Sequence, residues 1–143
     1  MITSYVDKRR LGVRGELSVT LELMKNGFDV YQSVCDTTKV DLIAAKDGHL
    51  FKIQVKSRNK SNGLSVYHFQ TRKKGSNKNH YKPGDADVWA LYCIEDDKVA
   101  FLTEEHALCQ GVWAFRMDGD VPKNNQRQSV HYISDFTIDK LDR

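Results

Sequence analysis

The most constraining feature of the sequence is the stretch 41–56, which predicts two β-strands joined by a tight turn. The first strand is an almost continuous apolar run with one acid in it, Asp41. The second strand, residues 50–56, alternates between apolar and polar side chains, as a half-buried strand does. Between them lies Asp47-Gly48, the dipeptide most typical of a two-residue hairpin turn. The stretch therefore predicts a β-hairpin.

Three polar side chains of this hairpin indicate chemistry. Asp41 interrupts an apolar strand, and Gln54 and Lys56 share one face of the strand that pairs with it. A buried carboxylate is unfavourable unless it is paired or bound to a cation. An acid beside a glutamine and a lysine thus suggests a metal ion and an anionic substrate. The alternative is a hairpin with a polar outer face, in which Asp41 pairs with a lysine.

Length and composition favour one soluble domain, residues 1–143, with a single core. No apolar run approaches the roughly 20 residues that cross a bilayer, and the first ten residues lack the apolar core of a signal peptide. We therefore expect a cytoplasmic protein, associated with the host nucleoid, and no membrane partner. The three cysteines are widely spaced, which argues against a disulfide framework or a zinc site. Each is expected to be a small buried hydrophobe.

The charges are segregated although the net charge is only +3. Residues 52–82 contain nine lysines and arginines and no acid, and a second basic group precedes and enters the first predicted helix. Such segregation is typical of a protein that binds a phosphate backbone, the alternative being a solvated basic loop. The side chains expected to contact DNA are Arg9, Arg10, Arg14, Arg58, Lys60, Arg72, Lys73, Lys74, Lys78, His80 and Lys82.

The first helix is predicted over about 11–26, because Val13, Leu17, Leu21 and Met24 recur as an amphipathic stripe and a glycine follows. Glu16 lies in this helix, either as plain surface or facing the hairpin. Periodicity and turn residues predict strands at 28–34, 64–69, 86–94, 99–102, 112–117 and 130–133, a short helix capped by Thr103, and a long basic loop over 71–83.

Four segments together resemble the PD-(D/E)XK nuclease superfamily: Gly15-Glu16, Gly27-Phe28-Asp29-Val30, 40–44 and 53–56. The spacing is most similar to that of small endonucleases encoded in group I introns and phages, and of archaeal Holliday-junction resolvases. The likeness covers about residues 12–108. It implies an α/β, restriction-endonuclease-like core over about 11–110, with a mixed central β-sheet flanked by helices. Residues 111–143 would be a C-terminal extension of strand and tail.

The resemblance also implies roles for site residues. Asp41, Gln54, the Val55 carbonyl and Glu16 would hold Mg²⁺, with Mn²⁺ able to substitute, and Lys56 would orient or activate the attacking water. Glu16, Asp41, Gln54 and Lys56 would thus be catalytic. The sequence departs from the family pattern at Gln54, where an acid is usual, and this substitution is expected to lower the affinity for a hard cation.

The function expected from this resemblance is that of a Mg²⁺-dependent homing endonuclease that cuts both strands of double-stranded DNA. One active site per chain would require a homo-dimer or homo-tetramer. Three alternatives stay open: a Holliday-junction resolvase, a DNA-binding module without catalysis, and a restriction enzyme.

Overall fold

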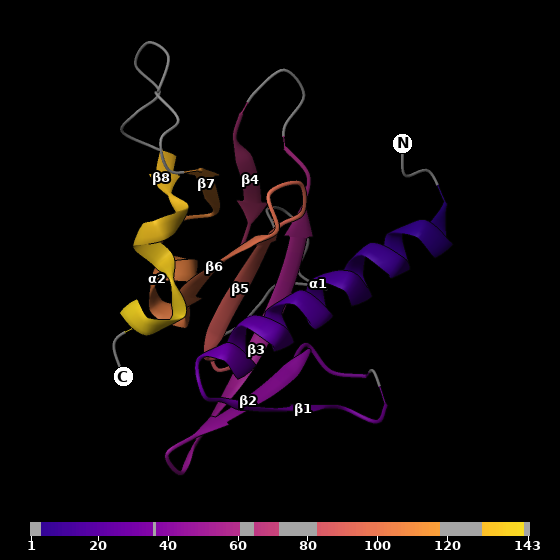
Figure 1. The fold of residues 1–143 in the computed structure, drawn as a ribbon, viewed down its shortest axis with the longest axis vertical. Helices are drawn as coiled ribbons and strands as arrows, with labels where there is room; N and C mark the ends of the chain where they lie inside the picture. The colour runs from indigo at the N-terminus through magenta and orange to yellow at the C-terminus, as the bar shows by residue number, and fades with distance from the viewer. Residues whose placement is uncertain (1–3, 36, 61–64, 72–82, 118–129, 142–143) are drawn as a thin grey trace.

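The computed structural model describes residues 4–35, 37–60, 65–71, 83–117 and 130–141. They form a five-stranded sheet and a three-stranded sheet, with one long helix (Figure 1). In chain order the elements are α1 (Tyr5–Lys25), β1 (Asp29–Gln32), β2 (Leu42–Lys46), β3 (His49–Arg58), β4 (Tyr67–Gln70), β5 (Val88–Cys93), β6 (Lys98–Thr103), α2 (Glu104–Cys109), β7 (Val112–Arg116), β8 (Val130–Tyr132), and the 3-10 turns η2 (Ile133–Phe136) and η3 (Ile138–Lys140).

The larger sheet is mixed, with the strand order β1-β2-β3-β5-β6. Its neighbours are antiparallel except β3 and β5, which are parallel and pair Gln54 with Trp89 and Lys56 with Leu91. The smaller sheet has the order β4-β7-β8, with β7 and β8 parallel. This arrangement confirms the predicted α/β class with a mixed central sheet.

The predicted hairpin at 41–56 is confirmed. β2 and β3 are antiparallel, with Leu42 opposite Ile53 and Lys46 opposite His49. The turn residues Asp47 and Gly48 have φ angles of 52° and 80°, the two positive values that a type I′ turn requires. This turn fixes the register, and so determines which residues of the two strands meet.

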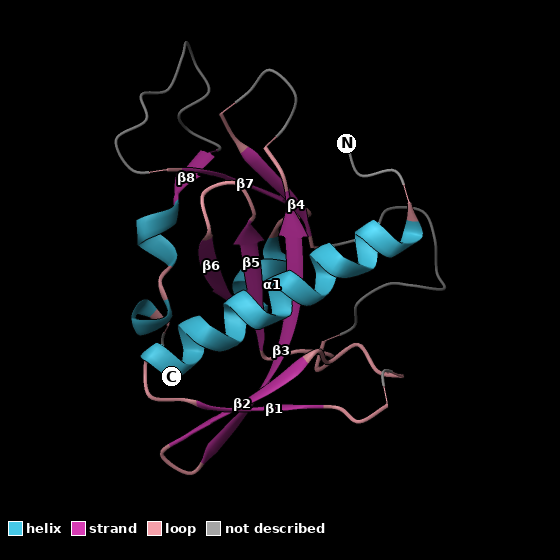
Figure 2. Ribbon diagram, turned by 45° about the vertical axis from the view of Figure 1, so that its right-hand side comes forward, coloured by secondary structure: helices cyan, strands magenta, loops and turns pink. Residues whose placement is uncertain are grey.

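Each face of the larger sheet is covered by a different layer. On one face α1 crosses the sheet in front of β3 and β5, where Val19 and Leu23 pack against residues such as Ile53 and Ala90 (Figure 2). On the other face the aromatic side chains of the smaller sheet pack against Trp89 and Leu91, together with residues of α2 and η2. The second face is therefore covered mainly by strands and not by a long helix.

Helix α1 begins earlier than predicted, at Tyr5. The hydroxyl of Ser4 caps it by accepting a hydrogen bond from the Asp7 N–H at 3.1 Å. At the other end Asn26 is the C-cap, and Gly27 follows with φ of 86°, as the sequence predicts for a residue just past a helix.

The apolar stripe of α1 does not lie in the core of this chain. The buried side of the helix consists of Gly15, Val19 and Leu23, whereas the stripe residues are about half exposed. Gly15 allows the helix to approach the sheet closely, since a Cβ built on it would lie 2.0 Å from the Ser57 Oγ. Bulky side chains at that position would hold the helix away from β3.

The remaining sequence predictions have mixed outcomes. Thr103 does cap α2, accepting a hydrogen bond from the His106 N–H at 3.3 Å. Cys93 is buried, and burial is the main cause that raises the pKa of its thiol to about 12. The expectation of burial is wrong for Cys35 and Cys109, which are exposed. The basic loop at 71–83 lies mostly outside the described residues. No described helix combines the length and apolar character needed to cross a membrane.

The Gly15 contact gives a test of the fold. We expect Gly15→Ala to lower the free energy of unfolding by about 1–2 kcal/mol, because the new methyl group overlaps the Ser57 side chain. Adding Ser57→Ala should restore most of the loss, and urea denaturation measures both. Gly12→Ala is the matched control, since nothing lies within 4 Å of its Cβ position. It should gain up to about 1 kcal/mol from helix propensity. Equal stabilities of the two alanine variants would contradict the proposed close packing.

Candidate active site

Asp41 lies immediately before β2 and is held by the backbone of β3. Its N–H donates to the Ile53 carbonyl at 2.9 Å, and its Oδ2 accepts a hydrogen bond from the Val55 N–H at 2.8 Å. The carboxylate therefore has a fixed place at the junction of two strands. A side chain held by rigid strands meets the geometric demand of a metal ligand better than one on a loop.

Gln54 lies next to Asp41, because Leu42 pairs with Ile53 and the chain continues in the same register. Gln54 is only 8% exposed, and its side-chain Oε1 is buried without a hydrogen-bond partner. A buried carbonyl oxygen without a partner is unfavourable by about 1–3 kcal/mol. An oxygen left in this state beside a carboxylate fits a site that completes itself by binding a cation.

Helix α1 brings Glu16 to the same place. Glu16, Asp41, Gln54 and Val55 all line one cavity of about 240 Å³, together with Arg9, Gly12, Val13 and Ser57. The four residues predicted to hold a metal ion, which come from α1, from the segment before β2 and from β3, are thus brought together. Carboxylate, amide and backbone carbonyl oxygens are the ligands that Mg²⁺ and similar hard cations take.

The cavity is poor in negative charge for a metal site. Its lining residues include two carboxylates, Glu16 and Asp41, and their other side-chain oxygens are neutral, the amide of Gln54 and the hydroxyl of Ser57. Correspondingly, the described residues contain no cluster of three or more His, Cys, Asp or Glu side chains that could hold a metal. The donor set fits a divalent cation, with a lower affinity than three carboxylates would give.

Lys56 lies two residues beyond Gln54 and lines an adjoining cavity of about 490 Å³. Gln54, Val55 and Ser57 line both cavities, so the two spaces share a wall. The Lys56 Nζ lies 5.8 Å from the centre of the Trp89 ring, a cation–π contact with the neighbouring strand β5. The lysine is therefore next to the Asp41 cavity and not among the residues that line it.

The basic residues predicted to contact DNA fall into three groups. Arg9 lines the Asp41 cavity, and Arg58 lines the Lys56 cavity. Arg10 forms an ion pair with Asp7 at 3.6 Å, and Lys60 forms one with Asp96 at 3.4 Å. Arg14 is exposed. The others lie outside the described residues: Arg72, Lys73, Lys74, Lys78, His80 and Lys82.

Sequence reasoning missed several residues that line the two cavities, among them Lys8, Gly12 and Ser57. Lys8 lines the Lys56 cavity, and Gly12 lines both cavities. The signal for Lys8 was the run Lys8-Arg9-Arg10, of which only the arginines were assigned to DNA. Gly12 lies one helical turn before Glu16, so its missing side chain leaves space beside that carboxylate. A glycine in mid-helix was the available signal for it.

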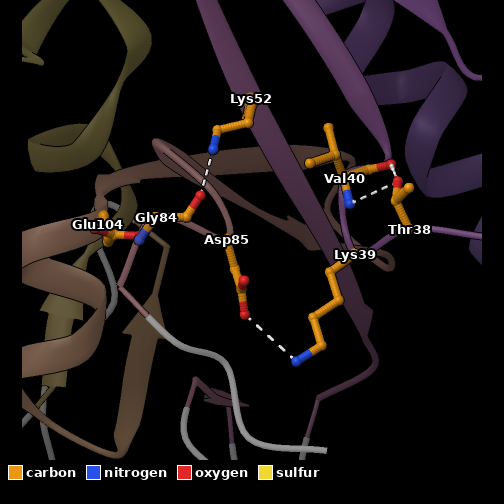
Figure 3. A network of polar contacts seen from close by, with 7 residues as sticks. All are labelled: Thr38, Lys39, Val40, Lys52, Gly84, Asp85 and Glu104. Carbon is orange, nitrogen blue, oxygen red and sulfur yellow. Dashed lines mark hydrogen bonds and ion pairs between the residues drawn. The ribbon is translucent and has the colours of Figure 1, made fainter.

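A polar network supports the segment that leads into Asp41 (Figure 3). Val40 and Thr38 exchange hydrogen bonds, and the Lys39 Nζ lies 3.4 Å from the Asp85 Oδ2. The neighbouring Gly84 accepts a hydrogen bond from Lys52 of β3 and donates one to Glu104 of α2. These contacts tie the lead-in to Asp41 to the segment before β5, and so stabilise the position of the acid.

An apolar cavity of about 340 Å³, larger than the Asp41 cavity, lies next to the C-terminal end of α1. Its lining includes Leu23, Phe28, Phe51 and Ile53, and its one acid is Asp87. The Asp87 Oδ2 already accepts a hydrogen bond from the Lys52 N–H at 2.8 Å. This cavity offers few polar groups, so the smaller cavity around Asp41 is the better candidate for chemistry.

Known proteins resemble this chain in sequence and in fold. A family model described as PD-(D/E)XK endonuclease matches residues 6–139. Protein 5.3 of Escherichia phage T7 is 29% identical over 99 residues, which cover 69% of this chain and 83% of that protein. In fold, the chain is similar to the structure of the bacterial homing endonuclease I-Ssp6803I, with a TM-score of 0.68 and 21% identity, over 84% of this chain and 81% of that chain.

The missing third carboxylate gives a test of the metal site. We expect Gln54→Glu to tighten Mn²⁺ binding about tenfold, because it adds a negative charge among the ligands, and Asp41→Asn to weaken it by a similar factor. Calorimetric titration with MnCl₂ measures both dissociation constants.

The matched control for this test is Gln70→Glu, which adds the same charge at an exposed position of β4. Its dissociation constant for Mn²⁺ should equal that of the unchanged chain. A site elsewhere would be indicated if neither Gln54→Glu nor Asp41→Asn changed the binding.

Proposed function

The chain belongs to the PD-(D/E)XK endonuclease family, and from this premise we propose that it is a homing-type enzyme that uses Mg²⁺ to make sequence-specific double-strand breaks in DNA. The chain is an endonuclease that acts on DNA, and enzymes of this family generally use divalent metal ions. The observation that carries the proposal concerns Gln54, whose Oε1 is buried without a hydrogen-bond partner. Gln54 lines the same cavity as Glu16 and Asp41.

Hydrolysis of a phosphodiester requires an aligned water, neutralisation of the charge that develops on phosphorus oxygens, and help for the leaving oxygen. Asp41, Gln54, Val55 and Glu16 would hold the metal ion, which when bound supplies that neutralisation. The hydrogen bond from the Val55 N–H orients the Asp41 carboxylate, so the ligand set needs little reorganisation. These residues would thus bind a scissile phosphate against the junction of β2 and β3.

Lys56 would act on the water and the developing charge. Its Nζ lies 5.8 Å from the centre of the Trp89 ring, and Lys56 lines the cavity that adjoins the metal ligands. From there its N–H donors can orient the attacking water or stabilise the phosphorane-like transition state. The contact with Trp89 restrains a long, flexible side chain, so that less conformational entropy is lost during the reaction.

The basic residues around the two cavities support binding of a nucleic-acid backbone. Lys8 and Arg9 come from the start of α1, and Arg58 comes from the end of β3. Together they place positive charge on the rim of both cavities, next to the proposed scissile phosphate. Such contacts fix the register of the protein on a duplex, while base contacts would supply the sequence specificity.

Lys56→Ala tests the mechanism. We expect the single-turnover rate of DNA cleavage to fall about 100- to 1,000-fold, while the dissociation constant for DNA measured with Ca²⁺ changes less than about threefold. The matched control is Lys140→Ala on η3, which removes a lysine outside the residues that line either cavity and should cleave normally. A Lys56→Ala protein that cuts at the full rate would refute this role.

A panel of three DNAs tests the substrate. With Mg²⁺ the protein should produce discrete fragments from a plasmid library that contains its target, and leave both a four-way junction and a random duplex intact. Cleavage confined to the junction would instead support a resolvase. Binding without cleavage, unaffected by Asp41→Ala, would leave only a DNA-binding role.

A further inference from the structure

The side of α1 that faces away from the sheet carries a row of apolar side chains. In Figures 1 and 2 no described element lies over this side of the helix. Its side chains form an outer stripe, each about half exposed to solvent: Val6 (55%), Val13 (47%), Leu17 (59%), Leu21 (54%) and Met24 (59%). Contiguous exposed apolar side chains on a soluble protein mark an interaction surface.

The spacing of the outer stripe makes it continuous from Val13 to Met24, and Arg10 lies between Val6 and Val13. At 3.6 residues per turn, all five residues fall within an arc of about 80°. The residues that pack on the sheet, Gly15, Val19 and Leu23, lie on the other side of the helix. Helix α1 therefore has two apolar sides, and the described residues bury only one of them.

We propose that the outer stripe of α1 packs against the same stripe of a second copy of the chain, with the two helices antiparallel about a two-fold axis. This inference rests on the proposed function, because one active site per chain needs a second copy to cut both strands. The helix has 21 residues and is about 31 Å long, which provides a long seam for an isologous contact.

The charges on α1 favour the antiparallel arrangement. Its N-terminal half carries four cations and one acid: Lys8, Arg9, Arg10, Arg14 and Asp7. Its C-terminal half carries two acids and one cation: Glu16, Glu22 and Lys25. An antiparallel pair places each basic half beside the less basic, acidic half of the partner, whereas a parallel pair would place the two basic halves together.

The position of the active site on α1 agrees with the same arrangement. Arg9, Gly12 and Glu16 follow one flank of the outer stripe and line the Asp41 cavity. In an antiparallel pair the two-fold axis is perpendicular to the plane of the two helices, so this flank faces the same way in both copies. Both cavities would then open on one side of the dimer. They would also lie close to the axis, because Gly12 and Glu16 are near the middle of the stripe.

In this dimer the outer stripe would also position the two active sites relative to each other. Two active sites that face one way and lie near a common axis can reach the two strands of a single duplex. The outer stripe would thus set the distance between the two cuts, since the crossing point of the helices fixes how far apart the cavities lie.

Sedimentation velocity of the full chain, without DNA or metal, tests the surface. The unchanged chain should sediment as a dimer or a higher even assembly, and Leu17→Glu/Leu21→Glu as a monomer, with dimerisation weakened at least about tenfold. Val112→Glu is the control, because it places the same charge at an exposed apolar residue of β7, 52% exposed. Circular dichroism should show equal folding of all three, because the substituted side chains are exposed. A monomeric unchanged chain, or a dimeric double variant, would overturn the inference.

Cysteine cross-linking tests the orientation. In a Cys35→Ser/Cys109→Ser background, a mixture of Val13→Cys and Leu17→Cys chains should form a mixed disulfide, and Met24→Cys chains should not cross-link to themselves. Efficient self-cross-linking through Met24→Cys would show parallel helices and refute the antiparallel pair.

Plasmid cleavage separates this inference from the proposed function. If the nuclease proposal holds, the unchanged chain should linearise a target plasmid, and Leu17→Glu/Leu21→Glu should leave mostly nicked circles. A dimer that cuts no DNA under any condition would refute the nuclease proposal alone. A double variant that sediments as a monomer and still linearises the plasmid in one step would refute the link between the stripe and the two cuts.

Discussion

The hydrogen bond from the Val55 N–H to the Asp41 carboxylate is the contact on which the candidate site depends. It occurs just before β2 begins, where β3 continues past its paired residues, so a side chain takes the place of a backbone partner. The same junction sets Gln54 beside the acid and leaves its Oε1 buried without a hydrogen bond. The close approach of Gly15 to Ser57 then brings α1 down onto β3, and with it Glu16. The site therefore depends on the Asp47-Gly48 turn, on the hydrogen bond from Val55 to Asp41, and on the absence of a side chain at Gly15.

How far the sequence alone could predict this site differs between its parts. The hairpin was predictable because its signals are local: alternation over a few residues and a dipeptide that tolerates positive φ. The buried face of α1 could not be predicted in this way. Apolar periodicity follows the bulky side chains, whereas the face that packs on the sheet includes Gly15, which has no side chain. The three strands of the smaller sheet were predicted, at 64–69, 112–117 and 130–133, but their pairing into a separate sheet was not. It depends on contacts between distant segments, such as those of Trp113 and Phe115 with His131, which no local pattern encodes.

Gln54 and Lys56 connect the candidate site to both layers of the protein. The strand β3 carries Ile53 toward the α1 layer and Gln54 and Lys56 toward β5 and its Trp89. Trp89 in turn packs among the aromatic residues of the smaller sheet. The site is therefore supported from both faces of the sheet, although only two of its side chains are acids. A neutral amide in place of a third acid lowers the charge repulsion that an empty site must tolerate.

The position of β3 between β2 and β5 has a consequence for how the molecule opens. Its amides are hydrogen-bonded in the middle of the larger sheet, where exchange with solvent deuterium requires the sheet itself to come apart. The stretch that bears Gln54, Val55 and Lys56 therefore belongs to the slowest-exchanging part of the protein. Fraying of the chain ends leaves it intact, so the strand that carries the candidate site is lost only when the whole fold is lost.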